Sequence, residues 1–538
     1  VVTDIKNLAL QEMPIYVVIA GLLSLVVLFL TMTSFVTPLI FLLNIGMAIV
    51  FNLGSNVFLG EISYITQALA AVLQLAVTMD YSIFLLESYE ANKERYEGDK
   101  KRAMAHAISN TFTSITASSI TTVAGFVALC FMTFKLGTNI GIVMSKGVVI
   151  GVLTCVTVLP AMILTCDKAI EKTTHRSLIP SLDKLSHGIV KGRYVALLLF
   201  LIVLVPAIHG NNNYKIYYNI DQSLPKNIPS NEANEKLKKE FNMSNMHMIL
   251  LKDGLSAKEK SAMSKEIEKV DGVKWVIGLN SLVGSNVPES MIPNDIKKML
   301  KTDNYELEFV SSDYSSATDE VNSQLAKIDK IVKKYQNDGM VIGEAPMMKD
   351  LQDVTDVDLK TVNNISILAI FVIILITFKS ISIPVILISV IEFAIACNMA
   401  VPFYTNTSLP FVASIVIGTI QLGATVDYAI LMTSRYHKER TERGQSKKDA
   451  IRIAHETSIK SILTSGLCFF AATFGVSVYS QVDMIGSICT LLSRGAIISM
   501  IVVICVLPAM LWIFDGVIKR TSWNMIKANV AKRDAEKK

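Results

Sequence analysis

The stretch QLAVTMDYSIFLL at 74–86 places an aspartate, Asp80, inside an apolar run, and QLGATVDYAILM at 421–432 does the same with Asp427. Each aspartate is followed directly by a tyrosine. An unpaired charge near the middle of a bilayer costs about 3 kcal/mol or more, so intramembrane acids mark ion or proton pathways by default. The doubled pair therefore predicts a proton-driven transporter.

The composition is that of a polytopic membrane protein. Hydrophobic residues make up 51% of the 538 residues and charged residues only 18%, and the mean hydropathy is +0.46. A helix of about 20 apolar residues spans the hydrocarbon core of a bilayer. Eleven such runs begin near Ile15, Pro38, Tyr64, Thr111, Ile140, Gly192, Ile365, Ile383, Leu409, Ile459 and Met484.

The basic residues predict the orientation, because Lys and Arg in short loops stay cytoplasmic. They gather at 93–102, at 435–448 and at 519–533. When the chain is threaded through the membrane eleven times, all three segments fall on the same side. We interpret the first two loops as solvated helices that fix topology; binding of anionic lipid headgroups is the alternative. The long polar segment from about 210 to 363 then lies outside. The net charge of +5 is mostly a topology signal and requires no nucleic-acid partner.

All seven cysteines lie within or at the end of predicted spans, so we expect no disulfide in the outside domain. Neither their spacing nor that of the seven histidines matches a metal site. We therefore expect no metal and no cofactor.

The chain is an internal repeat. Aligning Asp80 on Asp427 also superposes the neighbouring Gln, Thr, Ile and Ser positions, and small shifts extend the match along both halves. Because both copies run in the same direction, a pseudo-two-fold axis along the membrane normal is expected. The matched pairs include Gln74 and Gln421, Thr78 and Thr425, Ser114 and Ser461, Ser118 and Ser465, Lys146 and Arg494, and Pro160 and Pro508.

The two copies differ at their starts. The second begins with a lone span followed by the outside domain, whereas the first begins at Val1 in a stretch that matches the end of that domain, with Asp4 aligned on Asp350. We expect that one helix and one outside domain precede this sequence in the intact protein. A natural eleven-span protein is the alternative.

The outside domain shows two strand–helix–strand units in series, which predict a ferredoxin-like split βαβ architecture. A further short strand is expected at 214–218, near the membrane. The predicted elements are strands at 246–251, 273–279, 305–311 and 339–342 and helices at 257–270 and 317–334.

On a helix, Gln74, Thr78 and Tyr81 share a face and Asp80 lies beside it. The second copy repeats the arrangement with Gln421, Thr425, Tyr428 and Asp427. A carboxyl group among hydroxyls and amides holds its proton when desolvated and releases it when water enters, which makes it a conformational switch. If the repeats fold back on one another, we expect serines of the following helices to be hydrogen-bond neighbours of the acids. They are Ser114, Ser118, Ser461 and Ser465.

Structural interpretations stay open for the same residues. Asp80 and Asp427 could tie helices together, at about 1 kcal/mol for each polar contact, and the two tyrosines could be packing aromatics. Glu392 lies in the middle of a predicted span, and the repeat aligns it with Gly46 of the first copy. It is therefore not one of the duplicated residues. Its predicted role is either local pairing or a contact on the substrate path.

Together these features resemble the resistance–nodulation–division (RND) superfamily, in its MMPL-type branch of bacterial lipid and hydrophobe exporters. The resemblance covers nearly the whole chain. It rests on the two Asp-Tyr pairs, the split outside domain, Asp221 followed by Leu224-Pro225, and the Leu-Pro-Ala endings at Leu159 and Leu507. Drug-efflux relatives pair their acids with a lysine on the partner helix. Neither Asp-Tyr span has a lysine within it, which favours the MMPL branch.

The resemblance implies the fold class, the residue roles and the function. The fold would be a polytopic α-helical membrane protein with an RND-type pseudo-two-fold helical repeat and an α+β extracytoplasmic domain. The proton-relay residues would be Asp80, Tyr81, Asp427 and Tyr428, driven by the proton gradient. The protein would export lipids or other hydrophobic or amphiphilic molecules across the cytoplasmic membrane of a bacterium, with its C-terminus cytoplasmic. Its partners would be that cargo and membrane lipids, and a homo-oligomer is compatible with the sequence.

The corresponding division of the chain has seven parts. They are the end of a first outside domain at 1–12, first-repeat helices at 13–165, a cytoplasmic linker at 166–191, a lone helix at 192–210, the outside domain at 211–362, second-repeat helices at 363–515 and a cytoplasmic tail at 516–538.

Two other functions fit the same fold. A protein-export accessory would also be proton-driven, and a sterol-sensing or receptor-like relative would bind ligand without proton flux. The outside domain shows no nucleophile–base or metal-ligand cluster, so we expect no enzyme.

Overall fold

The computed structural model describes residues 2–96, 99–176, 178, 182–218, 229–240, 245–279, 294–523 and 525. The chain divides into two compact units, one formed mainly by 217–357 and the other by 3–216 and 358–538. The helix α13 begins in the first unit and ends in the second.

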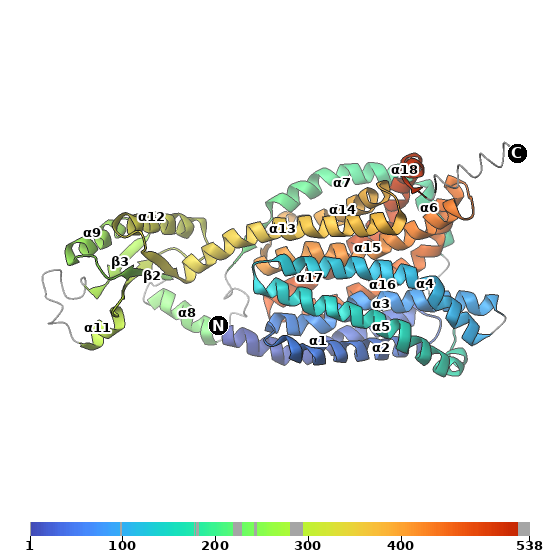
Figure 1. Ribbon diagram of the computed structural model, residues 1–538, viewed down its shortest axis with the longest axis horizontal. Coiled ribbons are helices and arrows are strands. Elements are labelled where there is room, and N and C mark those ends of the chain that lie inside the picture. Colours follow the sequence, from blue (N-terminus) through green and yellow to red (C-terminus); the bar gives the residue numbers. More distant parts are fainter. Residues whose placement is uncertain are drawn as a thin grey trace. The chain divides into compact units, whose positions relative to one another are not determined.

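The larger unit is a helical bundle (Figure 1). Eleven of its described helices are long and apolar enough to cross a membrane, which confirms the predicted polytopic class. They are α1 (Val2–Thr31), α2 (Val36–Gly54), α3 (Tyr64–Arg95), α4 (Lys100–Ala128), α5 (Lys135–Lys172), α7 (Arg193–Asn213), α13 (Glu344–Phe378), α14 (Ser382–Tyr404), α15 (Phe411–Thr441), α16 (Lys447–Tyr479) and α17 (Asp483–Cys505).

Several of these helices extend well beyond the apolar runs that predicted them. Hydrogen bonds and caps decide where a helix begins, whereas hydropathy marks only the part that suits lipid. Helix α16 starts at Lys447, where the hydroxyl of Ser446 accepts a hydrogen bond from the amide of Asp449. The apolar run inside it begins only near Ile459.

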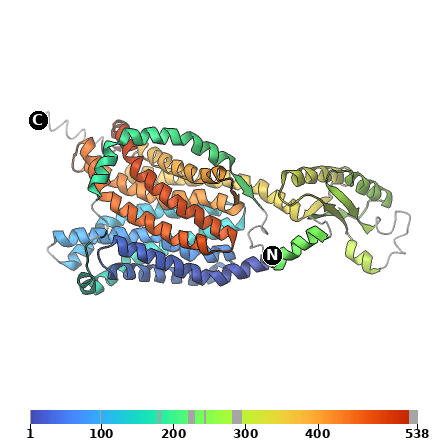
Figure 2. The same cartoon turned by 180° about the vertical axis from the view of Figure 1, so that it is seen from behind.

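The helices of the two repeats lie side by side in both views (Figures 1 and 2). Two of them form the centre. The most apolar 18-residue window of α3 is completely buried and that of α15 is 89% buried, whereas α1 and α7 bury only 22% and 11% of theirs. The helices that carry the Asp-Tyr pairs are therefore the ones most protected from lipid.

Shorter elements connect the bundle. The structure adds α6 (Asp183–Lys191), α18 (Leu507–Thr521) and two 3₁₀ helices, η1 (Ser55–Leu59) and η2 (Leu129–Phe131). The strand predicted at 214–218 is β1 (Lys215–Tyr217), which pairs with β6 (Ser408–Pro410). Proline acts differently in the two repeats: α5 runs through Pro160, whereas α17 ends just before Pro508 and α18 begins.

The smaller unit has the predicted ferredoxin-like arrangement. Its four strands form an antiparallel sheet in the order β3-β4-β2-β5, with β2 at the centre between β4 and β5. The described elements are α8 (Pro229–Glu240), β2 (Asn245–Lys252), α9 (Ala257–Ile267), β3 (Val273–Ile277), α11 (Asn294–Leu300), β4 (Tyr305–Ser312), α12 (Asp319–Tyr335) and β5 (Met340–Gly343).

Local sequence explains both long helices of this unit. A capping box joins Ser256 and Glu259 at the start of α9, and the hydroxyl of Thr318 caps α12. Alternation along the strands then directs one face of the sheet toward the helices. The buried core consists of Ile249, Leu251, Met263, Ile267, Val276, Val310, Ile328 and Val332. The segment with Asp221 and Leu224-Pro225 lies outside the described residues.

Candidate functional site

The two aspartates lie at the centre of the bundle. Asp80 on α3 is 3% exposed and Asp427 on α15 is 2% exposed. They are close enough to interact electrostatically. In the described structure each acid is held by hydroxyl groups, and none of the recorded ion pairs includes either one.

Asp80 is bound by the opposite repeat. The hydroxyl of Ser465, on α16, donates a hydrogen bond to its Oδ1. Ser465 is itself fully buried. The two repeats meet at this contact, because an acid of the first repeat accepts from a serine of the second.

Asp427 is bound in the reciprocal way by α4. Thr121 donates to its Oδ1 at 3.3 Å and Thr122 donates to its Oδ2 at 3.2 Å. Ser118, the repeat partner of Ser465, lies beside the same acid. The positions equivalent to the two threonines in the second repeat are Cys468 and Phe469. The site is therefore symmetrical in plan but not in hydrogen-bonding capacity.

The tyrosines lie near both acids. Tyr81 and Tyr428 are both fully buried, and each lies within electrostatic range of both aspartates. Neither hydroxyl has a hydrogen-bond partner among the described residues. The two hydroxyls are therefore available as hydrogen-bond donors or acceptors next to the acids.

The glutamines and threonines predicted as neighbours of the acids make hydrogen bonds to other groups in the described structure. Thr78 donates to the carbonyl oxygen of Gln74 at 2.8 Å, and Thr425 donates to that of Gln421 at 2.7 Å. These hydroxyls thus bond within their own helices and not to the acids. A threonine on a helix can bond the carbonyl four residues earlier, whereas it does not face a residue two positions later such as the aspartate.

The glutamines clamp neighbouring helices. Gln74 accepts from Asn52 of α2 at 2.8 Å and donates to the carbonyl of Gly147 on α5 at 3.0 Å. Gln421 repeats the clamp: it accepts from Asn398 of α14 at 2.8 Å and donates to Ser499 of α17 at 3.0 Å. These residues position α3 and α15.

A cation completes each clamp. Lys146 donates to the Asn52 carbonyl oxygen at 2.9 Å, and Arg494 donates to that of Asn398 at 3.0 Å. From the sequence, Lys146 and Arg494 were identified only as equivalent positions of the repeat. In the structure they fix the asparagines that hold the glutamines.

Three further predicted residues lie apart from the two acids. Ser461 donates to both carboxylate oxygens of Glu87, at 2.5 and 2.6 Å. Ser114 is half-buried, and no recorded hydrogen bond of the described residues joins it to an acid. Glu392 is half-buried on α14, and its Oε1 is enclosed without a hydrogen-bond partner in the described structure.

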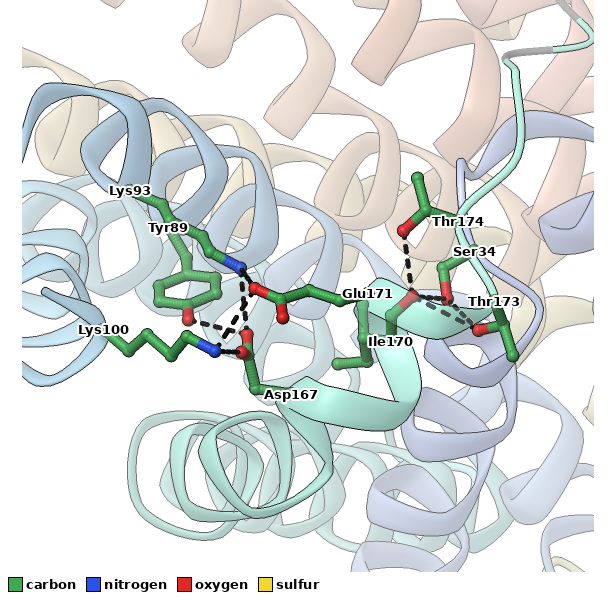
Figure 3. A network of polar contacts seen from close by, with 9 residues as sticks. All are labelled: Ser34, Tyr89, Lys93, Lys100, Asp167, Ile170, Glu171, Thr173 and Thr174. Atoms are coloured by element: carbon green, nitrogen blue, oxygen red, sulfur yellow. Dashed lines mark hydrogen bonds and ion pairs between the residues drawn. The ribbon is translucent and has the colours of Figure 1, made fainter. Parts of the chain in front are cut away.

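An ion cluster around the buried Asp167, near the end of α5, was not expected from the sequence (Figure 3). Asp167, 2% exposed, accepts from Tyr89 at 3.1 Å and from Lys93 at 3.2 Å, and it also pairs with Lys100. Glu171 pairs with Lys93 at 2.6 Å. The cluster joins the end of α3 to the end of α5.

The second repeat carries a smaller version of this cluster. Asp515 on α18 accepts from Tyr436 at 2.5 Å and from Arg440 at 3.0 Å. The Arg440 side chain is only 8% exposed, so the solvated role predicted for this loop is wrong at that position. A tyrosine, a basic residue and an aspartate recur at the repeat spacing, which is the sequence signal that could have revealed both clusters.

Within the described residues, no group of three or more His, Cys, Asp or Glu side chains is placed to hold a metal ion. The site can bind and release protons with carboxyl groups, and it can pass the change to helices through the hydroxyl contacts between repeats.

Comparison with known proteins identifies the family. The MMPL family matches residues 1–179 and 222–534. MmpL12 of Mycobacterium tuberculosis, described as a probable transport protein, is 24% identical over 304 residues, which are 54% of this chain and 26% of MmpL12. ActII-3 of Streptomyces coelicolor, described as a membrane protein, is 22% identical over 497 residues, which are 88% of this chain and 65% of ActII-3.

This chain thus spans about a quarter of the first relative and just under two thirds of the second. With a family match over most of its length and eleven described helices able to cross a membrane, the chain belongs to the MMPL family and is a multi-pass membrane protein.

Proposed function

We propose that this protein uses the proton gradient to export lipids or other hydrophobic or amphiphilic molecules across the bacterial cytoplasmic membrane. One observation carries the proton-driven part. The two acids buried in the central helices are held by hydroxyls from the opposite repeat, and no cation of the described residues forms an ion pair with either. A carboxyl group in that setting changes its charge when water reaches it, and such acids mark proton relays.

The geometry supports coupling between proton binding and helix movement. When Asp80 is ionised, it accepts the hydrogen bond from Ser465; when it is protonated, it gains a donor and the contact can rearrange. The reciprocal contact of Asp427 with Thr121 and Thr122 changes in the same way. Each proton therefore alters a contact between the two repeats, where a relative movement would open and close the transport path.

The available energy is sufficient for export. One charge that crosses about 100 mV yields about 2.3 kcal/mol. This corresponds to roughly a fortyfold concentration gradient at 1.4 kcal/mol per tenfold. Transfer of a lipid out of its leaflet requires more than one proton per cycle on this scale. The hydrophobic class of the cargo rests on the family resemblance, and fatty acids, glycolipids, lipopeptides and hydrophobic drugs all belong to it.

The test compares cells that express the intact protein with cells that express the Asp80→Asn plus Asp427→Asn variant. Untargeted mass spectrometry measures the lipids of the cell surface and the medium. The expected result is a loss of specific amphiphiles from the outside in the double variant, at equal protein in the membrane. Asp350→Asn is the matched control, since that aspartate is exposed on α13. Identical profiles for all three proteins would contradict proton-driven lipid export and favour a drug, protein-export or sensing role.

A further inference from the structure

A second carboxylate, Glu87, lies on the same side of α3 as the relay acid. It is seven residues after Asp80, which places the two on one face of the helix, about 10 Å apart along the axis at 1.5 Å per residue. Glu87 is one-third exposed, whereas Asp80 is buried. Along this face, Glu87 is therefore nearer to the basic end of the bundle.

Helix α16 connects the two acids. Ser465 donates to Asp80, and Ser461, one turn away, donates to Glu87 at 2.5 and 2.6 Å. Both serines are fully buried. Because α3 and α16 run in opposite directions, the order of the serines matches the order of the acids. The serine hydroxyls are about 6 Å apart along the helix, a distance that one or two water molecules can bridge.

The charge of Glu87 is balanced from a third helix. Arg435 on α15 lies 3.4 Å from its Oε2 and also donates to the carbonyl of Thr457 on α16. Arg435 opens the basic segment that follows the relay helix of the second repeat. The carboxylate thus has a serine on its buried side and an arginine on its exposed side.

The second repeat lacks this acid. The position equivalent to Glu87 is Ser434, and the position equivalent to Arg435 is Ser88. The ion pair of Glu87 and Arg435 is therefore not part of the internal repeat. It lies near Asp80, and Asp427 has no equivalent pair.

We propose that Glu87 is the proton-release group for Asp80, an inference that rests on the proposed proton-driven function. The proton leaves the Asp80 carboxylic acid, which becomes a carboxylate. It passes along the Ser465 and Ser461 hydroxyls and the intervening water, each of which accepts one proton and donates one. Glu87 accepts it, becomes a carboxylic acid and releases it to water at the basic end of the bundle.

The experiment measures proton flux in vesicles made from the polar lipids of the expressing cells, so that native lipid cargo is present. The intact protein is reconstituted with pyranine inside, and a pH gradient is imposed. Glu87→Gln keeps the size of the side chain and an oxygen that can accept from Ser461. The expected result is a flux about tenfold or more below that of the parent, whereas Ser434→Ala, the repeat-related control, retains the parent flux.

Added sodium azide separates proton transfer from packing. This small weak acid can replace a missing carboxylate as a proton carrier, so it is expected to restore flux in Glu87→Gln beyond its effect on empty vesicles. A slow Glu87→Gln variant without azide rescue, matched by an equally slow Arg435→Gln variant, would mean that the ion pair only positions helices and would overturn the inference.

The Asp80→Asn variant distinguishes the release role of Glu87 from the proposed proton-driven function. Loss of flux in Asp80→Asn together with parent flux in Glu87→Gln would overturn the release role alone. Full flux in the Asp80→Asn plus Asp427→Asn variant, or no flux in the parent, would overturn proton coupling itself and the inference with it.

Discussion

At the scale of single residues, positions that are equivalent in the two repeats have different hydrogen-bond partners. Asp80 and Asp427 are matched by the repeat, yet Asp80 accepts from one serine and Asp427 from two threonines. A hydrogen bond to a charged group contributes about 1.5–3 kcal/mol. The two acids therefore differ in how strongly their surroundings hold the ionised form.

The smaller unit also contains an acid in unusual surroundings. Glu308 is 2% exposed on β4, where Ser264 donates to it at 3.1 Å. Burial raises the pKa of Glu308 to about 7, against the lowering effect of that hydrogen bond. The neighbouring Glu306 raises the pKa further, although it is itself paired with the buried Lys260.

This acid makes the stability of the unit depend on pH. Because the folded pKa is above the ordinary value of 4.5, the folded unit binds the proton more tightly than the unfolded chain. The contribution of Glu308 to stability is therefore present at low pH and lost as the pH rises from about 4.5 to about 7. Glu308→Gln removes the dependence, so its stability relative to the parent should rise across that window by up to about 3 kcal/mol.

Hydrogen exchange of the amides of β4 and α9 in the intact protein measures this difference at several pH values. Glu268→Gln, at an exposed position at the end of α9, is the control and should follow the parent. A Glu308→Gln curve that stays parallel to the parent between pH 4.5 and 7 would contradict the prediction.

At the scale of helices, close packing depends on glycines next to the glutamine clamps. A Cβ atom at Gly495 would lie 2.7 Å from Oε1 of Gln421 and 2.8 Å from Nδ2 of Asn398. Gln421 cannot withdraw without losing its bonds to Asn398 and Ser499. Gly147 has the same relation to Gln74 and Asn52, so the small residue is part of the duplicated clamp.

Gly495→Ala should therefore separate α17 from α15. Forcing a methyl group into a packed site costs about 1–3 kcal/mol, which exceeds the gain of up to about 1 kcal/mol from replacing a helical glycine with alanine. We expect a lower melting temperature of the purified protein in detergent. Gly418→Ala on α15 is the control, because its Cβ would meet nothing within 4 Å and only the helical gain should remain. Equal or higher stability of Gly495→Ala would show that the clamp tolerates repacking.

At the scale of the whole molecule, the central site exists only when both repeats are present. The buried aspartate of each repeat is held by a helix of the opposite repeat: Asp80 by α16 and Asp427 by α4. The ion clusters at Asp167 and Asp515, in contrast, are each completed within one repeat. Contacts inside a repeat thus fix its helices, while contacts between repeats hold the two buried aspartates.

The basic loops predict on which side of the membrane each part of the chain lies. In a background without native cysteines, Lys327→Cys on the exposed surface of α12 should react with a membrane-impermeant maleimide in intact cells. Lys101→Cys, exposed near the start of α4, should react only after the cells are opened, because basic loops remain cytoplasmic. The cysteine-free parent controls for background labelling. The reverse labelling pattern would place the smaller unit inside the cell.

The sequence by itself determined the class of this protein, the eleven spans, the repeat and the split βαβ order of the smaller unit. These features follow from local patterns: apolar length decides what can cross a bilayer, and alternation or helical periodicity decides strand or helix. The two central aspartates were also identifiable, because an acid in an apolar run stands out from its neighbours.

Only the tertiary structure decided which groups meet. Gln74 and Thr78 share a helical face with Tyr81, but the glutamine contacts α2 and α5 and the threonine bonds its own backbone. Asp167 and Asp515 lie far along the chain from Tyr89 and Tyr436, so their clusters depend on how helix ends come together. A helical pattern specifies the direction of a side chain, whereas its partner is specified by the packing of helices that are distant in sequence.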